Sequence, residues 1–191
     1  MKNLNLQNTL VETGALLDGH FLLTSGLHSD KYIEKFRFLE NPEVLDNICF
    51  SMAELYKDKQ IDLVLGAAIG GILLSGNVGR HLGVRNIFTE RINNKMELRR
   101  GFHIEPSTRI LIVEDIVTTG GSVQEMIQIT NDYNAEIIGV AGIVDRSSID
   151  IDFGVKFSSL LKIPIQSWPP ENCPLCLSSI PFTSRGRTGK S

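Results

Sequence analysis

A run of four aliphatic residues, two carboxylates and a loop of small residues most constrains how this chain can fold. Ile110 to Val113 are typical of a strand buried on both faces, as in the interior of a parallel sheet. Glu114 and Asp115 end that strand, and the loop 118–122 leads into a stretch with helical apolar spacing. In open α/β sheets, ligands bind at this carboxyl edge, where loop amides and the positive helix terminus favour a phosphate. The run therefore predicts a site for a ligand with a phosphate at one end and hydroxyls or a metal at the other, such as phosphoribose.

The same run resembles the 5-phosphoribosyl 1-diphosphate (PRPP) signature of type I phosphoribosyltransferases. Four aliphatics, two acids and a Thr/Gly/Ser loop in this order form a specific pattern, whereas a glycine pair alone also fits an ordinary strand-to-helix turn. The resemblance implies that PRPP binds along the strand end and the loop, with Asp115 beside the reacting sugar as a catalytic residue. The residues assigned in this way are Glu114, Asp115, Ile116, Val117, Thr118, Thr119, Gly120, Gly121 and Ser122.

A second glycine turn, at residues 66–71, also lies between an expected strand and an expected helix. Its small residues let backbone amides approach an anion closely, although tight packing of a helix on a strand explains such glycines about as well. In the resembling family the corresponding loop holds the pyrophosphate half of PRPP. The resemblance therefore assigns Ala68, Ile69 and Gly70 to PRPP binding.

Helical and extended patterns alternate along the chain, which predicts βαβ units and a parallel sheet with right-handed crossovers. The expected helices are 5–17, 42–56, 70–82 and 121–134, and the expected extended segments are 21–24, 31–38, 61–67, 84–90, 109–114, 136–144 and 163–168. The fold class is α/β, and the resemblance makes it a type I phosphoribosyltransferase fold: a parallel twisted sheet flanked by helices, with a small hood. We expect a single domain in residues 1–191, composed of a core at 60–150, a hood from 1–40 and 153–170, and a partly disordered tail at 171–191.

Two further matches point to one branch of this family, the orotate phosphoribosyltransferases. Residues 20–32 resemble the hood segment of that branch, in which a phenylalanine precedes Ser-Gly and then a serine and an aromatic residue. Asp145-Arg146 is similar to its Asp-Arg pair, whose arginine binds orotate, and a guanidinium suits this planar anion because it donates two parallel hydrogen bonds. An ion pair of Arg146 with Asp145 or Asp150 is the alternative. The residues assigned to orotate are Ser25, Gly26, Tyr32, Thr118 and Arg146.

Residues 91–103 form a polar, basic connection between two expected strands. Connections this long are usually functional or disordered, and expulsion of pyrophosphate needs cations and the exclusion of water. We therefore expect a lid, with a solvated β-hairpin as the alternative. The resemblance assigns Arg91 and Lys95 to PRPP binding and catalysis.

The chain departs from the orotate branch at two places. Thr24 stands where that branch commonly has a lysine, and the His-Gly that usually ends its lid is absent, since His103 lies beyond Gly101. No catalytic histidine is therefore assigned, and Arg99, Arg100 or His103 could take that part.

Cys173 and Cys176 form a CxxC in the tail, which is half of a zinc-binding pattern. Structural zinc takes four ligands, and the only other cysteine, Cys49, lies in an expected helix, so we interpret the pair as reduced thiols. A four-cysteine site shared by two tails across a dimer axis is the alternative. The expected cofactor is Mg²⁺, held mainly by PRPP and water and not by protein ligands, because this ion commonly keeps several waters.

Composition argues against several other classes of protein. A net charge of −3 gives no electrostatic reason to bind nucleic acid or an anionic membrane. No apolar run approaches a membrane span, and the first ten residues lack the apolar region of a signal peptide. Three cysteines, an odd number, suit a reducing compartment. We therefore expect a cytoplasmic protein with no nucleic-acid or membrane partner.

Together these features predict a Mg²⁺-dependent glycosyltransferase (pentosyltransferase) of the orotate phosphoribosyltransferase family. The implied reaction of pyrimidine (UMP) biosynthesis converts orotate and PRPP to orotidine 5′-monophosphate and pyrophosphate. The resemblance also implies a homodimer in which the lid of one subunit closes over the site of the other. A purine phosphoribosyltransferase is the alternative within enzymes, since it shares the phosphate features and differs at the hood and at Arg146. A PRPP-sensing regulator is a second alternative, although such a protein needs a basic face or an added DNA-binding unit.

Overall fold

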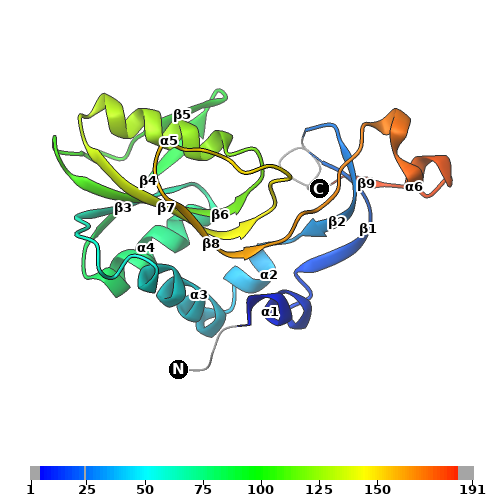
Figure 1. Ribbon diagram of the computed structural model, residues 1–191, viewed down its shortest axis with the longest axis horizontal. Helices are drawn as coiled ribbons and strands as arrows, with labels where there is room; N and C mark the ends of the chain where they lie inside the picture. Colours follow the sequence, from blue (N-terminus) through cyan, green and yellow to red (C-terminus); the bar gives the residue numbers. More distant parts are fainter. Residues whose placement is uncertain (1–4, 24, 185–191) are drawn as a thin grey trace.

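The computed structural model describes residues 5–23 and 25–184. It consists of a six-stranded sheet flanked by helices and a three-stranded sheet beside it (Figure 1). The large sheet has the order β5-β4-β3-β6-β7-β8, and its strands are parallel except that β5 runs antiparallel to β4. The small sheet has the order β2-β1-β9.

The strands are β1 (Leu16–Leu22), β2 (His28–Ile33), β3 (Leu63–Ala67), β4 (Arg85–Ile92), β5 (Lys95–Leu98), β6 (Arg109–Val117), β7 (Glu136–Asp145), β8 (Phe157–Lys162) and β9 (Thr183–Ser184). The helices are α1 (Leu6–Glu12), α2 (Phe36–Leu39), α3 (Pro42–Glu54), α4 (Gly70–Leu82), α5 (Gly121–Asp132) and α6 (Pro174–Leu177), and η1 (Pro170–Asn172) is a 3₁₀ helix. The predicted α/β class with a mostly parallel sheet is confirmed.

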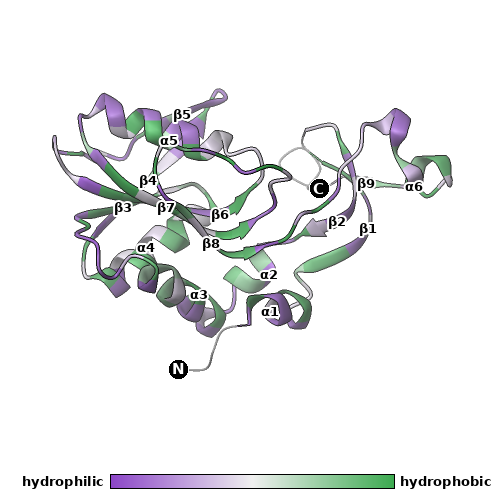
Figure 2. Ribbon diagram, viewed as in Figure 1, coloured by the Kyte–Doolittle hydropathy of each residue, from purple (hydrophilic) through white to green (hydrophobic). Residues whose placement is uncertain are grey.

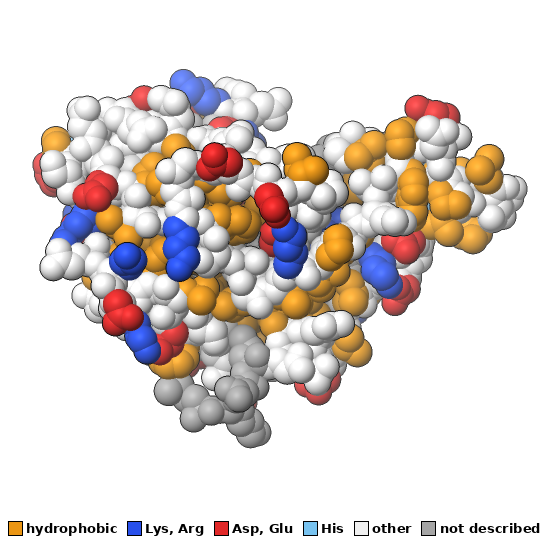
Figure 3. Space-filling model, viewed as in Figure 1, with side chains coloured by type: hydrophobic (Ala, Val, Ile, Leu, Met, Phe, Trp, Pro, Cys, Tyr) orange, Lys and Arg blue, Asp and Glu red, His pale blue; other side chains and the backbone are white. Residues whose placement is uncertain are grey.

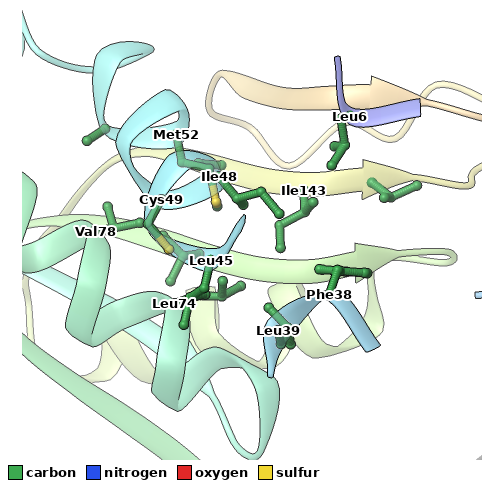
Figure 4. Close-up of a cluster of buried hydrophobic side chains, with 14 of the residues drawn as sticks. Leu6, Phe38, Leu39, Leu45, Ile48, Cys49, Met52, Leu74, Val78 and Ile143 are labelled. Carbon is green, nitrogen blue, oxygen red and sulfur yellow. The ribbon is translucent and has the colours of Figure 1, made fainter. Parts of the chain in front are cut away.

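The large sheet is buried on both faces. Helices α3 and α4 cover one face, and α5 covers the other (Figure 1). Along β3, Leu63 and Leu65 belong to the hydrophobic cluster on the α5 side, whereas Val64 belongs to the cluster on the α3 side. Figure 4 shows the cluster on the α3 side of the sheet, in which Leu45 of α3 lies beside Leu74 of α4. Burial on both faces explains why the central strands are nearly unbroken aliphatic runs.

The predicted helices 42–56, 70–82 and 121–134 are confirmed to within two residues at each end. The Asn41 side chain caps α3 by accepting hydrogen bonds from the backbone of Glu43 and Val44 (3.1 and 3.2 Å), and α4 ends at Gly83 in the left-handed conformation. Each of the three helices carries hydrophobic and hydrophilic residues (Figure 2), as expected for helices between a sheet and solvent. Among the described residues, no helix is long and apolar enough to cross a membrane.

The N-terminal expectations are wrong in part. Helix α1 ends at Glu12 and does not reach residue 17, because the chain turns at Gly14 (φ +62°) and β1 begins at Leu16. The expected extended segment 31–38 divides into the end of β2 and the one-turn helix α2, which buries Phe38 in the core. Residue 24, the last of the expected segment 21–24, lies outside the described residues.

The C-terminal expectation of an extended segment at 163–168 is also wrong. The strand is β8, which pairs with β7 at the edge of the large sheet and therefore belongs to the core and not to the hood. Pro164 has no N–H to extend this ladder, and the chain leaves the sheet until Trp168 pairs with His28 of β2 through two backbone hydrogen bonds of 2.8 Å. In the tail, β9 pairs with β1; residues 185–191 lie outside the described part of the chain.

The expected lid segment 91–103 contains a β-hairpin, which is the alternative interpretation of its sequence. Strand β4 continues to Ile92, and β5 pairs back against it. Asn93 and Asn94 form the turn with φ angles of 48° and 64°, a conformation that asparagine tolerates and that two-residue hairpin turns require. Residues 91–98 therefore extend the large sheet.

Candidate active site

A cavity of about 1150 Å³ opens at the carboxyl ends of β3, β4 and β6, and the segment after β2 closes one side of it. This is the edge where parallel sheets bind ligands. The predicted site residues that line the cavity are Tyr32, Ala68, Ile69, Arg91, Glu114, Ile116, Val117, Thr118, Thr119, Gly120, Gly121 and Ser122. The predicted residues outside this lining are Ser25, Gly26, Gly70, Lys95, Asp115 and Arg146.

The loop after β6 brings the N-terminus of α5 to the cavity, since Gly121, Ser122 and Val123 all line it. The first N–H groups of a helix have no partner within the helix and carry its positive partial charge, so this end suits a phosphate. Gly120 precedes the helix with φ +78°, and a Cβ there would lie 2.7 Å from the Phe153 ring. The glycine is therefore required by both backbone conformation and space.

The second glycine turn packs β3 tightly against α4. A Cβ on Gly66 would lie 2.2 Å from the Gly71 carbonyl oxygen, and one on Gly70 would lie 2.0 Å from Asp115 Oδ2. Ala68 and Ile69 reach the cavity, while Gly70 lies behind them against the acidic pair. Close packing thus accounts for the glycines, and the turn also borders the site.

The acidic pair at the end of β6 is buried, with Glu114 7% and Asp115 4% exposed. Asp115 Oδ2 accepts a hydrogen bond of 2.6 Å from Lys35 Nζ, and its Oδ1 accepts one of 2.7 Å from the backbone of Ile116. Glu114 Oε1 accepts from the backbone of Asp115 (3.0 Å). These bonds compensate part of the cost of burying carboxylates. They hold Glu114 in the cavity lining and Asp115 beside Lys35 and Gly70.

Arg146 follows β7, and its backbone N–H donates to the Val117 carbonyl at 2.8 Å, which fixes it behind the phosphate loop. Its Nε is buried without a hydrogen-bond partner. Burial lowers the pKa of the guanidinium, while the nearby Tyr32 opposes that change. Within the described residues, Asp145 and Asp150 both pair with Lys162 and not with Arg146. The alternative prediction, an ion pair of Arg146 with Asp145 or Asp150, is therefore wrong.

Arg91 is held at the cavity by Glu125 of α5. Arg91 Nη1 donates to Glu125 Oε2 at 3.1 Å and to the Asn94 carbonyl at 2.8 Å, and Nη2 pairs with Glu125 Oε1. Glu125 also accepts from the backbone of Met96 in β5 (3.1 Å). One carboxylate therefore ties the hairpin to the helix that follows the phosphate loop, whereas Lys95 at the hairpin tip is exposed.

Three other candidates lie away from the cavity. The Gly26 N–H donates a hydrogen bond to the Leu23 carbonyl oxygen (2.9 Å) within the β1–β2 turn, and Ser25 Oγ accepts a hydrogen bond from the Leu27 N–H (3.4 Å). His103 pairs with Glu105 at 3.1 Å on the surface. Contact of Ser25 or Gly26 with a base would thus require a change in the turn.

Sequence reasoning missed Lys35 and Glu125, which both line the cavity. Glu125 lies three residues after Ser122 on α5, so helical spacing from the phosphate loop could have indicated it. Lys35 belongs to no motif and meets Asp115 only because the segment after β2 folds over the end of β6.

Comparison with known proteins agrees with this geometry. Residues 37–169 match the model of the phosphoribosyl transferase domain family. The chain is 47% identical to orotate phosphoribosyltransferase of Caldicellulosiruptor bescii over 179 residues, covering 94% of each chain. It is 45% identical to that of Thermotoga maritima over 184 residues, covering 96% of this chain and 98% of the relative.

Among solved structures, orotate phosphoribosyltransferase from Aeropyrum pernix superposes with a TM-score of 0.71 at 21% identity, covering 83% of this chain and 93% of the other. That likeness concerns the fold, whereas the family matches extend over the phosphate loop, the acidic pair and Arg146 together. This chain belongs to the phosphoribosyl transferase family and, within it, to the orotate phosphoribosyltransferases.

Proposed function

We propose that this protein transfers the 5-phosphoribosyl group from PRPP to orotate, giving orotidine 5′-monophosphate and pyrophosphate for pyrimidine biosynthesis. The bond between ribose C1 and a pyrophosphate oxygen breaks, a bond from C1 to a ring nitrogen of orotate forms, and that nitrogen loses its proton. The observation that carries the choice of base is Arg146, whose Nε is buried without a hydrogen-bond partner beside the phosphate loop.

Orotate supplies what Arg146 lacks. Its carboxylate and ring carbonyl lie in one plane and can accept parallel hydrogen bonds from a guanidinium fork. A buried, unpaired donor is costly, so a ligand that satisfies it gains affinity. Tyr32, which lines the cavity and interacts electrostatically with Arg146, would border the same base.

The two phosphate groups of PRPP find complementary sites at neighbouring strand ends. The loop 118–122 and the N-terminus of α5 would hold the 5-phosphate, and the turn at Ala68 and Ile69 would hold the pyrophosphate. The support for this assignment is that both loops border one cavity, so a single ligand can reach them.

Glu114, which lines the cavity, and its neighbour Asp115 would hold the ribose hydroxyls. Their carboxylate oxygens are also the ligand type that Mg²⁺ prefers, so they fit an ion that keeps its waters and is bound mainly through PRPP. When bound, Mg²⁺ would neutralise charge on the pyrophosphate. Lys35 donates a hydrogen bond to Asp115 and orients this carboxylate.

Arg91 would stabilise the charge that develops on departing pyrophosphate. Its pairing with Glu125 holds it at the cavity of its own chain. Lys95 is exposed at the tip of the same hairpin, which suits a contact with the active site of a second subunit. We therefore propose a homodimer in which Lys95, and not Arg91, is the shared part of the lid. Among the described residues none of the three cysteines forms a disulfide, which also suits the reducing cytoplasm.

A panel of bases tests the proposal directly. Purified protein with PRPP and Mg²⁺ is offered orotate, uracil, adenine, guanine, hypoxanthine or xanthine, and release of pyrophosphate is followed. We expect turnover with orotate and little with uracil, which is the matched control because it lacks only the carboxylate. Turnover of a purine without turnover of orotate would contradict the proposed function.

A further inference from the structure

Two histidines and two cysteines from distant parts of the chain meet outside the active site. His20 of β1, His28 of β2 and the CxxC pair Cys173 and Cys176 each offer one ligand atom, and these four atoms all lie within 4.8 Å of one another. None of the four side chains lines the cavity described above. The fold thus brings two imidazoles to the CxxC pair, which the sequence-based interpretation as reduced thiols did not take into account.

The spacing of these atoms is close to that of a tetrahedral zinc site. Zn–N bonds of about 2.0–2.1 Å and Zn–S bonds of about 2.3 Å at tetrahedral angles place ligand atoms about 3.3–3.8 Å apart. Here Cys173 Sγ lies 3.5 Å and Cys176 Sγ 3.8 Å from His20 Nε2, and Cys176 Sγ lies 3.2 Å from His28 Nδ1. The two ring nitrogens are 2.7 Å apart, so a small rotation of one imidazole opens the centre for an ion.

The orientation of His20 is set by a hydrogen bond outside the cluster. Its Nδ1 lies 2.7 Å from the Ile180 carbonyl oxygen. Because a carbonyl can only accept, Nδ1 carries the proton, and the lone pair of Nε2 faces the other three side chains. Such a bond to the second ring nitrogen is the usual support of a metal-binding histidine.

Three of the four side chains are buried, whereas Cys176 is half-buried. His20 is 4% exposed, His28 3% and Cys173 0%. The Phe182 ring packs against both imidazoles, with centroids 5.6 and 4.9 Å apart. An aromatic ring at this position shields the two imidazoles from solvent on one side, and the polarity around a metal site tunes the ion's bonds to its ligands.

The segment that carries the cysteines has almost no core of its own. Helices η1 and α6 contain no buried residue, and they project from the body of the protein at the right of Figure 1. Figure 3 shows hydrophobic side chains on the surface of this projection, where Leu177 and Ile180 are exposed. Small units with so little buried apolar surface commonly depend on a metal or a disulfide.

We propose that His20, His28, Cys173 and Cys176 bind one zinc ion per chain. Two thiolates and two neutral imidazoles in tetrahedral arrangement favour zinc, and a CxxC has the usual ligand spacing. Four protein ligands leave no open position, so the ion is structural and takes no part in phosphoribosyl transfer. It joins the C-terminal segment to both strands that flank the β1–β2 turn.

Metal content of the full-length, untagged protein tests the proposal. Protein expressed with added zinc and dialysed against metal-free buffer is analysed by mass spectrometry for zinc, iron, copper and nickel. We expect one zinc per chain, and Co²⁺ added to protein refolded without metal should give the visible absorption of tetrahedral thiolate coordination. Removal of zinc by a chelator should lower the melting temperature and speed chymotrypsin cleavage after Leu177.

Matched variants locate the ion. Cys176→Ser and His28→Gln should lose zinc, whereas Cys49→Ala and His103→Gln, which change residues outside the cluster, should retain it. Zinc below about a tenth per chain in the wild-type protein, with no Co²⁺ spectrum, would overturn the proposal whether or not the variants fold. So would a Cys173–Cys176 disulfide in protein isolated without reductant, or another metal at full occupancy.

Discussion

Replacing Arg146 with alanine separates base recognition from every other part of the proposed site. A charge-assisted, bidentate hydrogen bond contributes about 1.5–3 kcal/mol. At 25 °C this energy corresponds to a loss of about 10- to 150-fold in kcat/KM for orotate. Because the Nε of Arg146 is buried without a partner in the ligand-free protein, its removal should not lower the melting temperature.

Three measurements separate the effects of the substitution. Steady-state kinetics at saturating PRPP give kcat/KM for orotate, calorimetry gives the affinity for PRPP, and thermal unfolding gives the melting temperature. Arg146→Lys keeps the charge without the planar fork, so we expect its kcat/KM to fall between those of wild type and Arg146→Ala. Arg85→Ala, which removes an exposed arginine bonded to the His103 carbonyl, is the control and should change none of them. The reasoning is refuted if Arg146→Ala changes orotate kcat/KM less than about threefold, or weakens PRPP binding as much as it weakens orotate use.

Four other outcomes test the rest of the site and the hydrophobic core. The double variant Glu114→Gln/Asp115→Asn should lose measurable PRPP binding in calorimetry while its circular dichroism is unchanged; intact affinity would contradict a ribose site at this pair. Arg91→Ala and Lys95→Ala should each reduce kcat far more than PRPP affinity. In heterodimers of an Asp115→Asn subunit with a Lys95→Ala subunit, about half of the active sites should be active. In heterodimers of an Asp115→Asn subunit with an Arg91→Ala subunit, none should be active. The opposite result would make Arg91, and not Lys95, the shared cation. Burial raises the pKa of Cys49 to about 12, so its thiol should resist alkylation at pH 8 in the folded protein; rapid labelling there would show that the core opens.

The C-terminal segment shows why local patterns mislead where tertiary contacts decide. Residues 163–168 carry an extended pattern, yet the strand is β8, because pairing with β7 selects the preceding segment. The hairpin at 91–98 has a turn signal in Asn93-Asn94, but from sequence alone the length and basic charge of this connection favour a lid over a hairpin. Its contact with Glu125 of α5 is what holds it at the cavity.

The sequence by itself determined the α/β class, the helices α3, α4 and α5, and the phosphate loop, because each of these is encoded by neighbouring residues. Aliphatic runs, helical spacing and a glycine turn after a strand act over a few positions, and a chain that contains them has few alternative local structures. The acidic pair belongs to the same group, since it ends the buried strand that precedes the loop.

Only the tertiary structure decided which distant side chains become partners. Lys35 meets Asp115 across 80 positions of sequence, and Cys173 meets His20 across 153. No periodicity links such residues, because their approach follows from the packing of separate elements and from the path of the chain between the two sheets. The physical reason is that local sequence patterns specify which helix or strand a residue belongs to. The partners that pair with a buried charge, bind a metal together with it or complete its hydrogen bonds are the groups that the completed fold places within a few ångströms.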